Sequence, residues 1–127
     1  MKLLTLACVT ILLSALNPSP AISSVLSDPE GHEGVEVTLE GVSMGHNLEQ
    51  TYLLMGYEQP ISNRDFVLHD STGMIYVSTV MKIIVNGEVR YKEYLVPDGR
   101  EIRVTGVIEL DDYGNPYLHA NQRPVVL

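Results

Sequence analysis

The sequence predicts a small all-β domain that closes into a barrel, and three observations support this prediction. Short runs of alternating apolar and polar residues recur along the chain, as in strands that bury one face. Turn sequences containing glycine separate these runs, and helical periodicity is hard to find beyond the N-terminal segment. The first run also changes its pattern at Gly41, and a bent strand can serve two sides of a closed sheet.

Residues 1–21 have the composition of a secretory signal. One basic residue, Lys2, precedes a short apolar run that ends near Leu16, and the small residues Ser19 and Ala21 indicate cleavage after Ala21. The apolar run is shorter than the roughly 20 residues that a membrane-spanning helix needs. We therefore expect an exported protein (periplasmic, cell-surface or secreted). The alternative is an uncleaved N-terminus that contacts the membrane as an anchor.

The composition limits the chemistry of the exported chain. Loss of 21 residues from 127 leaves 127 − 21 = 106, enough for one hydrophobic core. Cys8 is the only cysteine and lies in the leader, so we expect neither a disulfide nor thiolate chemistry. The formal charge is −8, and no Lys or Arg lies between Lys2 and Arg64. This acidity disfavours nucleic acid as a partner, because nucleic-acid binders gain most of their non-specific affinity from cationic surfaces.

We expect a flexible linker over residues 22–33 and one β domain over residues 34–127. The linker segment is rich in serine and contains few large apolar residues. The first strand of the domain is expected from Gly34 to about Met44. The residues expected on its buried face are Val35, Val37 and Leu39 before the bend at Gly41, and Val42 and Met44 after it.

A long connection separates this strand from the next clear one. Its pattern is blurred between residues 45 and 63, although Thr51–Met55 is a candidate for a short buried strand. In barrels such loops often carry function. The alternative is an insertion that covers one end of the barrel.

The sequence Asp70-Ser71-Thr72-Gly73 lies between two alternating runs, over residues 66–69 and 74–78. The Asp70 side chain is suited to accept hydrogen bonds from the backbone amides that follow it, and Gly73 to adopt a positive φ. We therefore predict two antiparallel strands joined by a tight turn.

Asn86-Gly87 predicts a second hairpin, because both residues accept the positive φ of a type I′ turn. In this register Ile84 faces Val89 and Lys82 faces Tyr91. We predict a long third strand that continues into a β-arm within residues 79–96. Two later strands are expected at 101–110 and 117–120, after turns at 97–99 and 111–116.

This order of elements resembles the OB-fold superfamily, whose members are five-stranded Greek-key barrels. The resemblance rests on the bent first strand, the Asp70-x-Thr72-Gly73 turn, the run Gly99–Gly106 and the short last strand, and it covers about residues 34–122. It implies a small five-stranded OB-like barrel, here with an extra β-hairpin arm where many members have a helix.

The resemblance also implies a ligand face on strands two and three. Tyr76 and His69 on this face would stack on a base or another flat ligand, and Arg64, Lys82, Arg90 and Lys92 would add a cationic rim. The candidate ligand-binding residues are Val67, His69, Met74, Tyr76, Ser78, Lys82, Arg90 and Lys92.

No motif for catalysis or metal binding is present. The sequence lacks Gly-x-Ser-x-Gly, His-Glu-x-x-His and a phosphate-binding glycine loop, and its four histidines have no recognised metal-ligand spacing. We expect no catalytic residue, no metal and no cofactor. The expected function is a non-catalytic binding or adaptor module outside the cytoplasm, for a protein or small-molecule partner. The alternatives are single-stranded nucleic-acid binding and a small hydrolase with a convergent Ser/His/Asp cluster.

Overall fold

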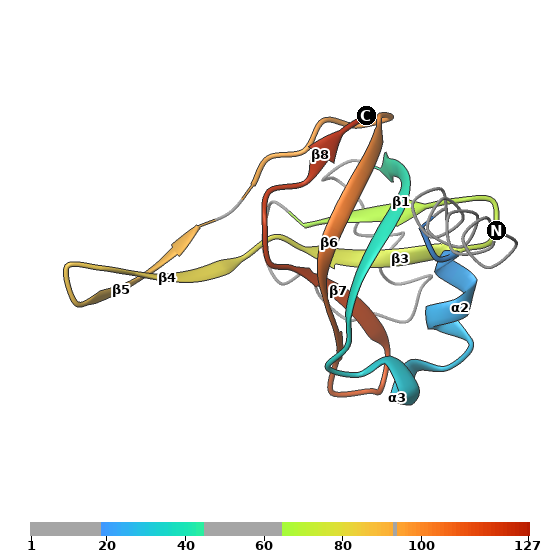
Figure 1. Cartoon of the computed structure of the whole chain (residues 1–127), viewed down its shortest axis with the longest axis horizontal. Helices are drawn as coiled ribbons and strands as arrows, with labels where there is room; N and C mark the ends of the chain where they lie inside the picture. The colour runs from blue at the N-terminus through green and yellow to red at the C-terminus, as the bar shows by residue number, and fades with distance from the viewer. Residues whose placement is uncertain (1–18, 45–64, 93) are drawn as a thin grey trace, which may run out of the picture.

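The computed structural model describes residues 19–44, 65–92 and 94–127 (Figure 1). Most of the expected signal segment and the candidate strand at Thr51–Met55 lie outside these residues. No helix among the described residues is long and apolar enough to cross a membrane. The elements are α2 (Ile22–Leu26), α3 (Pro29–His32), β1 (Glu36–Met44), β2 (Phe66–His69), β3 (Met74–Ser78), β4 (Met81–Val85), β5 (Glu88–Lys92), β6 (Glu101–Leu110), β7 (Pro116–Ala120) and β8 (Val125–Val126).

Five strands form a closed barrel in the order β1-β2-β3-β7-β6, and pairing of β6 with β1 closes it. The β3–β7 pair is parallel, whereas the other barrel pairs are antiparallel. The short strand β8 adds to β6 outside the ring. The predicted all-β barrel is thus confirmed, with its apolar core made by inward residues of all five strands.

Strand β1 changes its pairing partner beside Gly41, where the sequence predicts a bend. It pairs with β6 from Glu36 to Val42 and with β2 from Val42 to Met44, so it serves two sides of the barrel. A Cβ atom at Gly41 would lie only 2.4 Å from the carbonyl oxygen of His69, which explains the glycine there.

The buried face of β1 differs from the expected one, because the alternation continues past Gly41. Leu39 is buried as expected, but Val37 is half-buried and Val35 is 42% exposed. Beyond Gly41 the buried residue is Ser43, and Val42 and Met44 are half-buried. The Ser43 hydroxyl is satisfied because it donates to the carbonyl oxygen of Pro97.

The hairpin of β2 and β3 has the predicted turn and register, from Phe66 opposite Val77 to His69 opposite Met74. Gly73, however, does not adopt a positive φ. A Cβ atom on it would lie 3.0 Å from Cδ1 of Leu26, so a glycine at this position lets α2 pack against the turn.

The segment 22–33 is not a flexible linker in this structure. It forms α2 and α3, and the side chains of Ile22 and Val25 are fully buried in the barrel core. These two residues are three apart, so one turn of helix places both on the same face. Asp28 is the N-cap of α3, and its side chain accepts a hydrogen bond from the amide of Gly31 at 3.2 Å.

The hairpin of β4 and β5 projects from the barrel as an arm, on the side away from α2 and α3 (Figure 1). Asn86 and Gly87 have φ values of 51° and 77°, and the strands pair in the predicted register. The expected continuous third strand is interrupted, since β3 ends at Ser78 and β4 begins at Met81. The arm is therefore a separate two-stranded sheet.

Candidate functional site

The eight predicted ligand-binding residues do not form one surface. On strands β2 and β3, Val67, Tyr76 and Ser78 are buried, whereas His69 is half-buried and Met74 is 42% exposed. The remaining three residues lie apart from them on the arm. These arm residues are Lys82, Arg90 and Lys92.

Tyr76 is held in a buried contact on the outer face of the β2–β3 hairpin. Its hydroxyl donates a hydrogen bond to the carboxylate of Asp65, and both residues are 1% exposed. Its ring meets the ring of Tyr117 edge to face, with centroids 6.2 Å apart. Stacking on a base requires an accessible aromatic face, which Tyr76 does not offer in this structure.

Substitution Tyr76→Phe tests whether Tyr76 is structural. We expect the free energy of unfolding to fall by about 1–3 kcal/mol, because the buried Asp65 carboxylate loses one donor. Denaturant unfolding measures the change. The matched control is Tyr91→Phe on the arm, where the side chain is 69% exposed and we expect no measurable change. Equal stability of the two variants would contradict a structural role for Tyr76.

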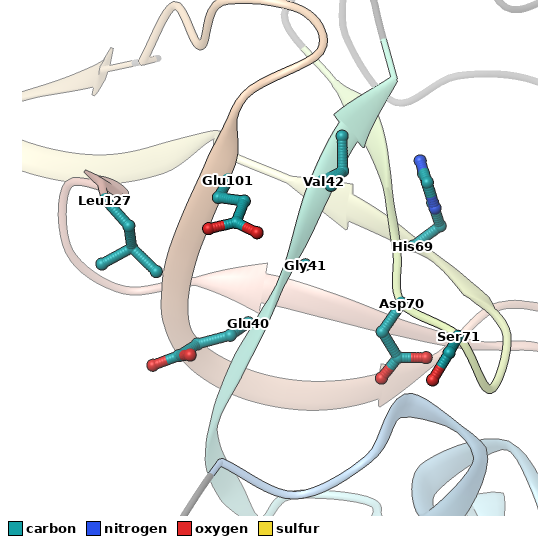
Figure 2. A pocket seen from close by; sticks show the side chains of 8 residues that line it. All are labelled: Glu40, Gly41, Val42, His69, Asp70, Ser71, Glu101 and Leu127. Carbon is teal, nitrogen blue, oxygen red and sulfur yellow. The ribbon is translucent and has the colours of Figure 1, made fainter.

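A groove of about 500 Å³ crosses β1 beside Gly41 (Figure 2). Glu101 and Leu127 lie on the β6 side of β1, and Asp70 lies on the β2 side. The groove is lined by Glu40, Gly41, Val42, His69, Asp70, Ser71, Glu101 and Leu127.

The carboxylates of this groove are largely engaged elsewhere. Glu40 forms an ion pair with Arg103, with 2.8 Å between Oε1 and Nη2, and Asp70 accepts hydrogen bonds within its own turn and from α2. No group of three or more His, Cys, Asp or Glu residues in the described part of the chain is placed to hold a metal ion. The groove therefore has acidic walls but no convergent ligand set.

The groove also brings His69, Asp70 and Ser71 together, the residue types of a hydrolytic cluster. Within the described residues, no hydrogen bond joins His69 to Asp70 or to Ser71, and the Asp70 carboxylate is aimed at backbone amides instead. A nucleophile–base–orienter chain needs these hydrogen bonds. The geometry gives the hydrolase alternative no support.

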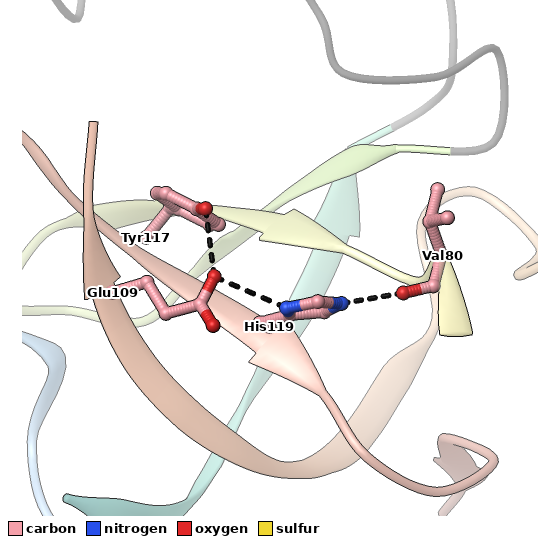
Figure 3. Close-up of polar contacts among 4 residues, drawn as sticks. All are labelled: Val80, Glu109, Tyr117 and His119. Atoms are coloured by element: carbon pink, nitrogen blue, oxygen red, sulfur yellow. Dashed lines mark hydrogen bonds and ion pairs between the residues drawn. The ribbon is translucent and has the colours of Figure 1, made fainter. Parts of the chain in front are cut away.

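A polar network connects the barrel with the start of the arm (Figure 3). Glu109 on β6 accepts a hydrogen bond from the Tyr117 hydroxyl at 2.7 Å and lies 3.1 Å from Nδ1 of His119. The other ring nitrogen of His119 donates to the carbonyl oxygen of Val80, in the link between β3 and β4. Both ring nitrogens thus face oxygen acceptors, and the network fixes the backbone from which the arm leaves the barrel.

The Tyr117 hydroxyl is not suited to chemistry near neutral pH. Its partial burial, followed by its hydrogen bond and charge interaction with Glu109, raises the pKa of this hydroxyl above its ordinary value. The group therefore stays neutral and acts as a donor. The network therefore has a structural role, which is to attach the arm to the barrel.

The arm has an exposed apolar face. Ile84 is 71% exposed, its cross-strand partner Val89 is 52% exposed, and Tyr91 on the same face is 69% exposed. Burial of one such side chain contributes about 1.5–3 kcal/mol. Three exposed apolar side chains on one face of a projecting hairpin are therefore typical of a surface that a partner covers.

A second groove, of about 390 Å³, lies where the chain returns from the arm to the barrel. Two cations lie near the ring of Tyr94 there, with Lys92 Nζ and the Arg123 guanidinium each 5.3 Å from its centroid. Leu95 is 67% exposed beside them. The lining residues are Lys92, Tyr94, Leu95, Val96, Pro97, Arg123, Pro124 and Val126.

We call both faces of the β4–β5 hairpin together with this groove the arm surface. It carries four of the eight basic residues of the chain, namely Lys82, Arg90, Lys92 and Arg123. Lys82 lies on the apolar face with Ile84, whereas Arg90 and Lys92 lie on the opposite face of the hairpin. The sequence predicted the first three of these four residues as a cationic rim together with Arg64, which lies outside the described residues. It missed the groove, because the lining residues come from the end of the arm, the following loop and the C-terminal tail. The run Lys92-x-Tyr94 was the available signal for the aromatic–cation contact.

No protein-family model matches this sequence, and no curated protein matches it. The function is therefore inferred from the two grooves, the polar network and the arm surface.

Proposed function

We propose that the chain is a non-catalytic OB-fold module that acts outside the cytoplasm and binds a protein partner through the arm surface. The proposal depends on one observation above all, the exposed apolar face of Ile84, Val89 and Tyr91 on a projecting hairpin. The closed five-stranded barrel is compatible with the OB-fold superfamily. The leader-like composition of residues 1–21 supports export.

The charge of the arm indicates the chemistry of the partner. Strands β4 and β5 carry Lys82, Arg90 and Lys92 against Glu88, which gives 3 − 1 = +2, whereas the whole chain carries −8. Complementary potentials guide association and suppress wrong partners. We therefore infer a partner surface with an apolar centre and acidic residues around it.

The attachment of the arm to the barrel supports a role of the arm in binding. A binding element needs a defined position, and the Glu109–His119–Val80 contacts attach the base of the arm to β6 and β7. Thr79 adds a second attachment, since its hydroxyl lies 3.3 Å from the carbonyl oxygen and 3.4 Å from the amide of Tyr94. Both ends of the arm are thereby fixed to one another and to the barrel.

Single-stranded nucleic acid is the second candidate partner, and one observation favours it. Tyr91 is exposed and lies opposite Lys82, which combines a stacking surface with a cation. The acidic charge of the chain disfavours this candidate. Binding of a labelled oligonucleotide that weakens with salt and is lost in Tyr91→Ala would favour it over a protein partner.

Site-specific photo-crosslinking in the cells that make the protein tests the proposal. A photoreactive amino acid at Ile84 is expected to give a discrete adduct with one other protein. The matched control places the same group at Tyr113, which is 65% exposed in the β6–β7 turn, and is expected to give no such adduct.

Charge reversal on the hairpin provides a second test of the same proposal. Lys82→Glu, on the same face as Ile84, is expected to lower the adduct yield at Ile84 about tenfold, because it places a like charge opposite the acidic partner. Equal adducts at Ile84 and Tyr113, no adduct at Ile84, or an adduct only with a second copy of this chain would contradict the adaptor function.

A further inference from the structure

The N-terminal amides of α2 are bound by a turn that lies far away in the sequence. The backbone nitrogen of Ile22 donates to Oδ2 of Asp70 at 3.0 Å, and that of Ser23 donates to Oγ1 of Thr72 at 3.0 Å. Ala21, in the N-cap position, makes no side-chain capping bond. The β2–β3 turn thus caps the helix in its place.

The Asp70 carboxylate is surrounded by donors but has no cationic side chain against it among the described residues. Its Oδ1 accepts from the amide of Thr72 at 2.7 Å and from the amide of Gly73 at 3.1 Å, and also from the Thr72 hydroxyl. Burial works to raise its pKa, but the hydrogen bonds from Ile22, Thr72 and Gly73 outweigh it and hold the pKa of this carboxyl below its ordinary value. The charge is therefore kept, in a place where a cation would be strongly favoured.

We propose that the exported chain begins at Ile22 and that the new α-ammonium group of Ile22 forms an ion pair with Asp70. Hydrolysis of the Ala21–Ile22 peptide bond consumes one water. The Ala21 carboxylate leaves with the leader, and the nitrogen of Ile22 remains as an ammonium group at neutral pH. This inference rests on the proposed export of the chain and is independent of the partner of the arm.

The geometry favours Ile22 over its neighbours as the first residue of the exported chain. Its nitrogen is already 3.0 Å from a carboxylate oxygen, a distance suited to a charge-assisted hydrogen bond. A chain that began one residue later would lose the fully buried Ile22 side chain. A chain that began at Ala21 would place its ammonium one residue away from the carboxylate.

The cleavage also removes an acceptor. The carbonyl oxygen of Ala21 accepts hydrogen bonds from the amide of Ser24 at 3.0 Å and from its hydroxyl at 2.6 Å, both at an exposed position. Water can replace that acceptor, because the position is exposed. The ion pair with Asp70 is partly buried and gains more from its surroundings.

The other charged groups near this pair, within the described part of the chain, are few. His69 precedes Asp70 on its own element, and Glu40 of β1 and Glu101 of β6 line the same groove. Helix α2 carries no acidic residue in its first turn and no basic residue in its last. Glu40 is paired with Arg103, so Glu101 is the glutamate that favours an ammonium group in this region, in the same sense as Asp70.

The pair predicts a specific pH dependence. An α-amino group has an unfolded pKa of about 7.7–8.0, and the neighbouring carboxylate raises it in the folded chain. Its contribution to stability is fully present below the unfolded pKa and is lost as the pH rises through the folded pKa. An uncleaved chain has an amide at this position, which does not titrate.

The test begins with the full chain, expressed with its leader in an exporting host. Intact-mass measurement and N-terminal sequencing of the purified protein are expected to give a chain that starts at Ile22. Nuclear magnetic resonance titration of its α-amino group is expected to give a pKa at least one unit above the ordinary value of about 8. Any other N-terminus, or an α-amino pKa at or below about 8, would overturn the inference.

Two variants separate the ion pair from a general effect of the leader. Ser19→Leu with Ala21→Leu removes the small residues of the cleavage site, and the uncleaved chain is expected to show no loss of Tm between about pH 8 and 10. Asp70→Asn in the cleaved protein keeps an oxygen acceptor for the turn and is expected to abolish the same loss. A loss of Tm that persists in both variants would also overturn the inference.

Discussion

Replacement of Gly106 by alanine is expected to destabilise the barrel by about 3 kcal/mol or more, the upper range for overpacking. A Cβ atom at this position would lie 2.2 Å from the carbonyl oxygen of His119 and 2.8 Å from the Cα of Ala120. Both are backbone atoms of β7, so no rotation of a side chain can relieve the clash. Strand β6 would have to move, and it pairs at Gly106 with both β1 and β7.

Denaturant unfolding measures this effect as a lower transition midpoint with an unchanged slope. The matched control is Gly114→Asn in the β6–β7 turn. Gly114 has a φ of 81°, which asparagine tolerates, and among the described residues beyond its chain neighbours no atom would lie within 4 Å of a Cβ atom there. We expect a change within about 1 kcal/mol for this control. Equal midpoints for the two variants would show that β6 and β7 do not approach each other as closely as in this structure.

Much of the barrel could be predicted from the sequence because its signals are local. The turn at Asn86-Gly87 and the alternation of strands β6 and β7 each depend on a few neighbouring residues. Gly41 and Gly106 lie inside strands, and a glycine in the interior of a strand indicates a bend or a close approach of backbones. Both positions prove to be close approaches.

The exposure of the residues on the expected ligand face could not be predicted from the sequence, because alternation separates two faces of a strand without telling which of them is covered. Val67 and Tyr76 point away from the barrel core, as predicted, and yet they are buried. The uninterrupted apolar run Phe66-Val67-Leu68 was a signal for this, since strands buried on both faces have continuous apolar sequences.

The helices of residues 22–33 could not be predicted from the sequence for a related reason. The composition of this segment is polar, and an overall composition does not reveal that two of its apolar residues are buried in the core. Ile22 and Val25 are only two apolar residues at a helical spacing, too few for a periodicity to stand out. Their burial depends on the β2–β3 turn, where Asp70 and Gly73 contact α2. A local sequence pattern cannot predict this contact, because Ile22 and Asp70 are 48 residues apart.

Substitution Ile22→Ala is expected to lower the free energy of unfolding by about 2–5 kcal/mol, the usual cost of truncating a buried isoleucine. Ile22 is fully buried in the same cluster as Phe66 and Ile75, so the smaller side chain leaves a cavity in the barrel core. A change of this size corresponds to a fall in Tm of about 10 °C or more for a domain of this length. Thermal unfolding followed by circular dichroism measures it.

Ser24→Ala is the matched control, because Ser24 is exposed on the opposite side of the same short helix. We expect a change within about 0.5 kcal/mol, as for most surface substitutions. The two interpretations of residues 22–33 differ sharply here, since a flexible linker would give the same small effect for both variants. A large effect confined to Ile22→Ala would show that this segment is part of the barrel core, and that the helix bound by the Asp70 turn contributes to the stability of the whole domain.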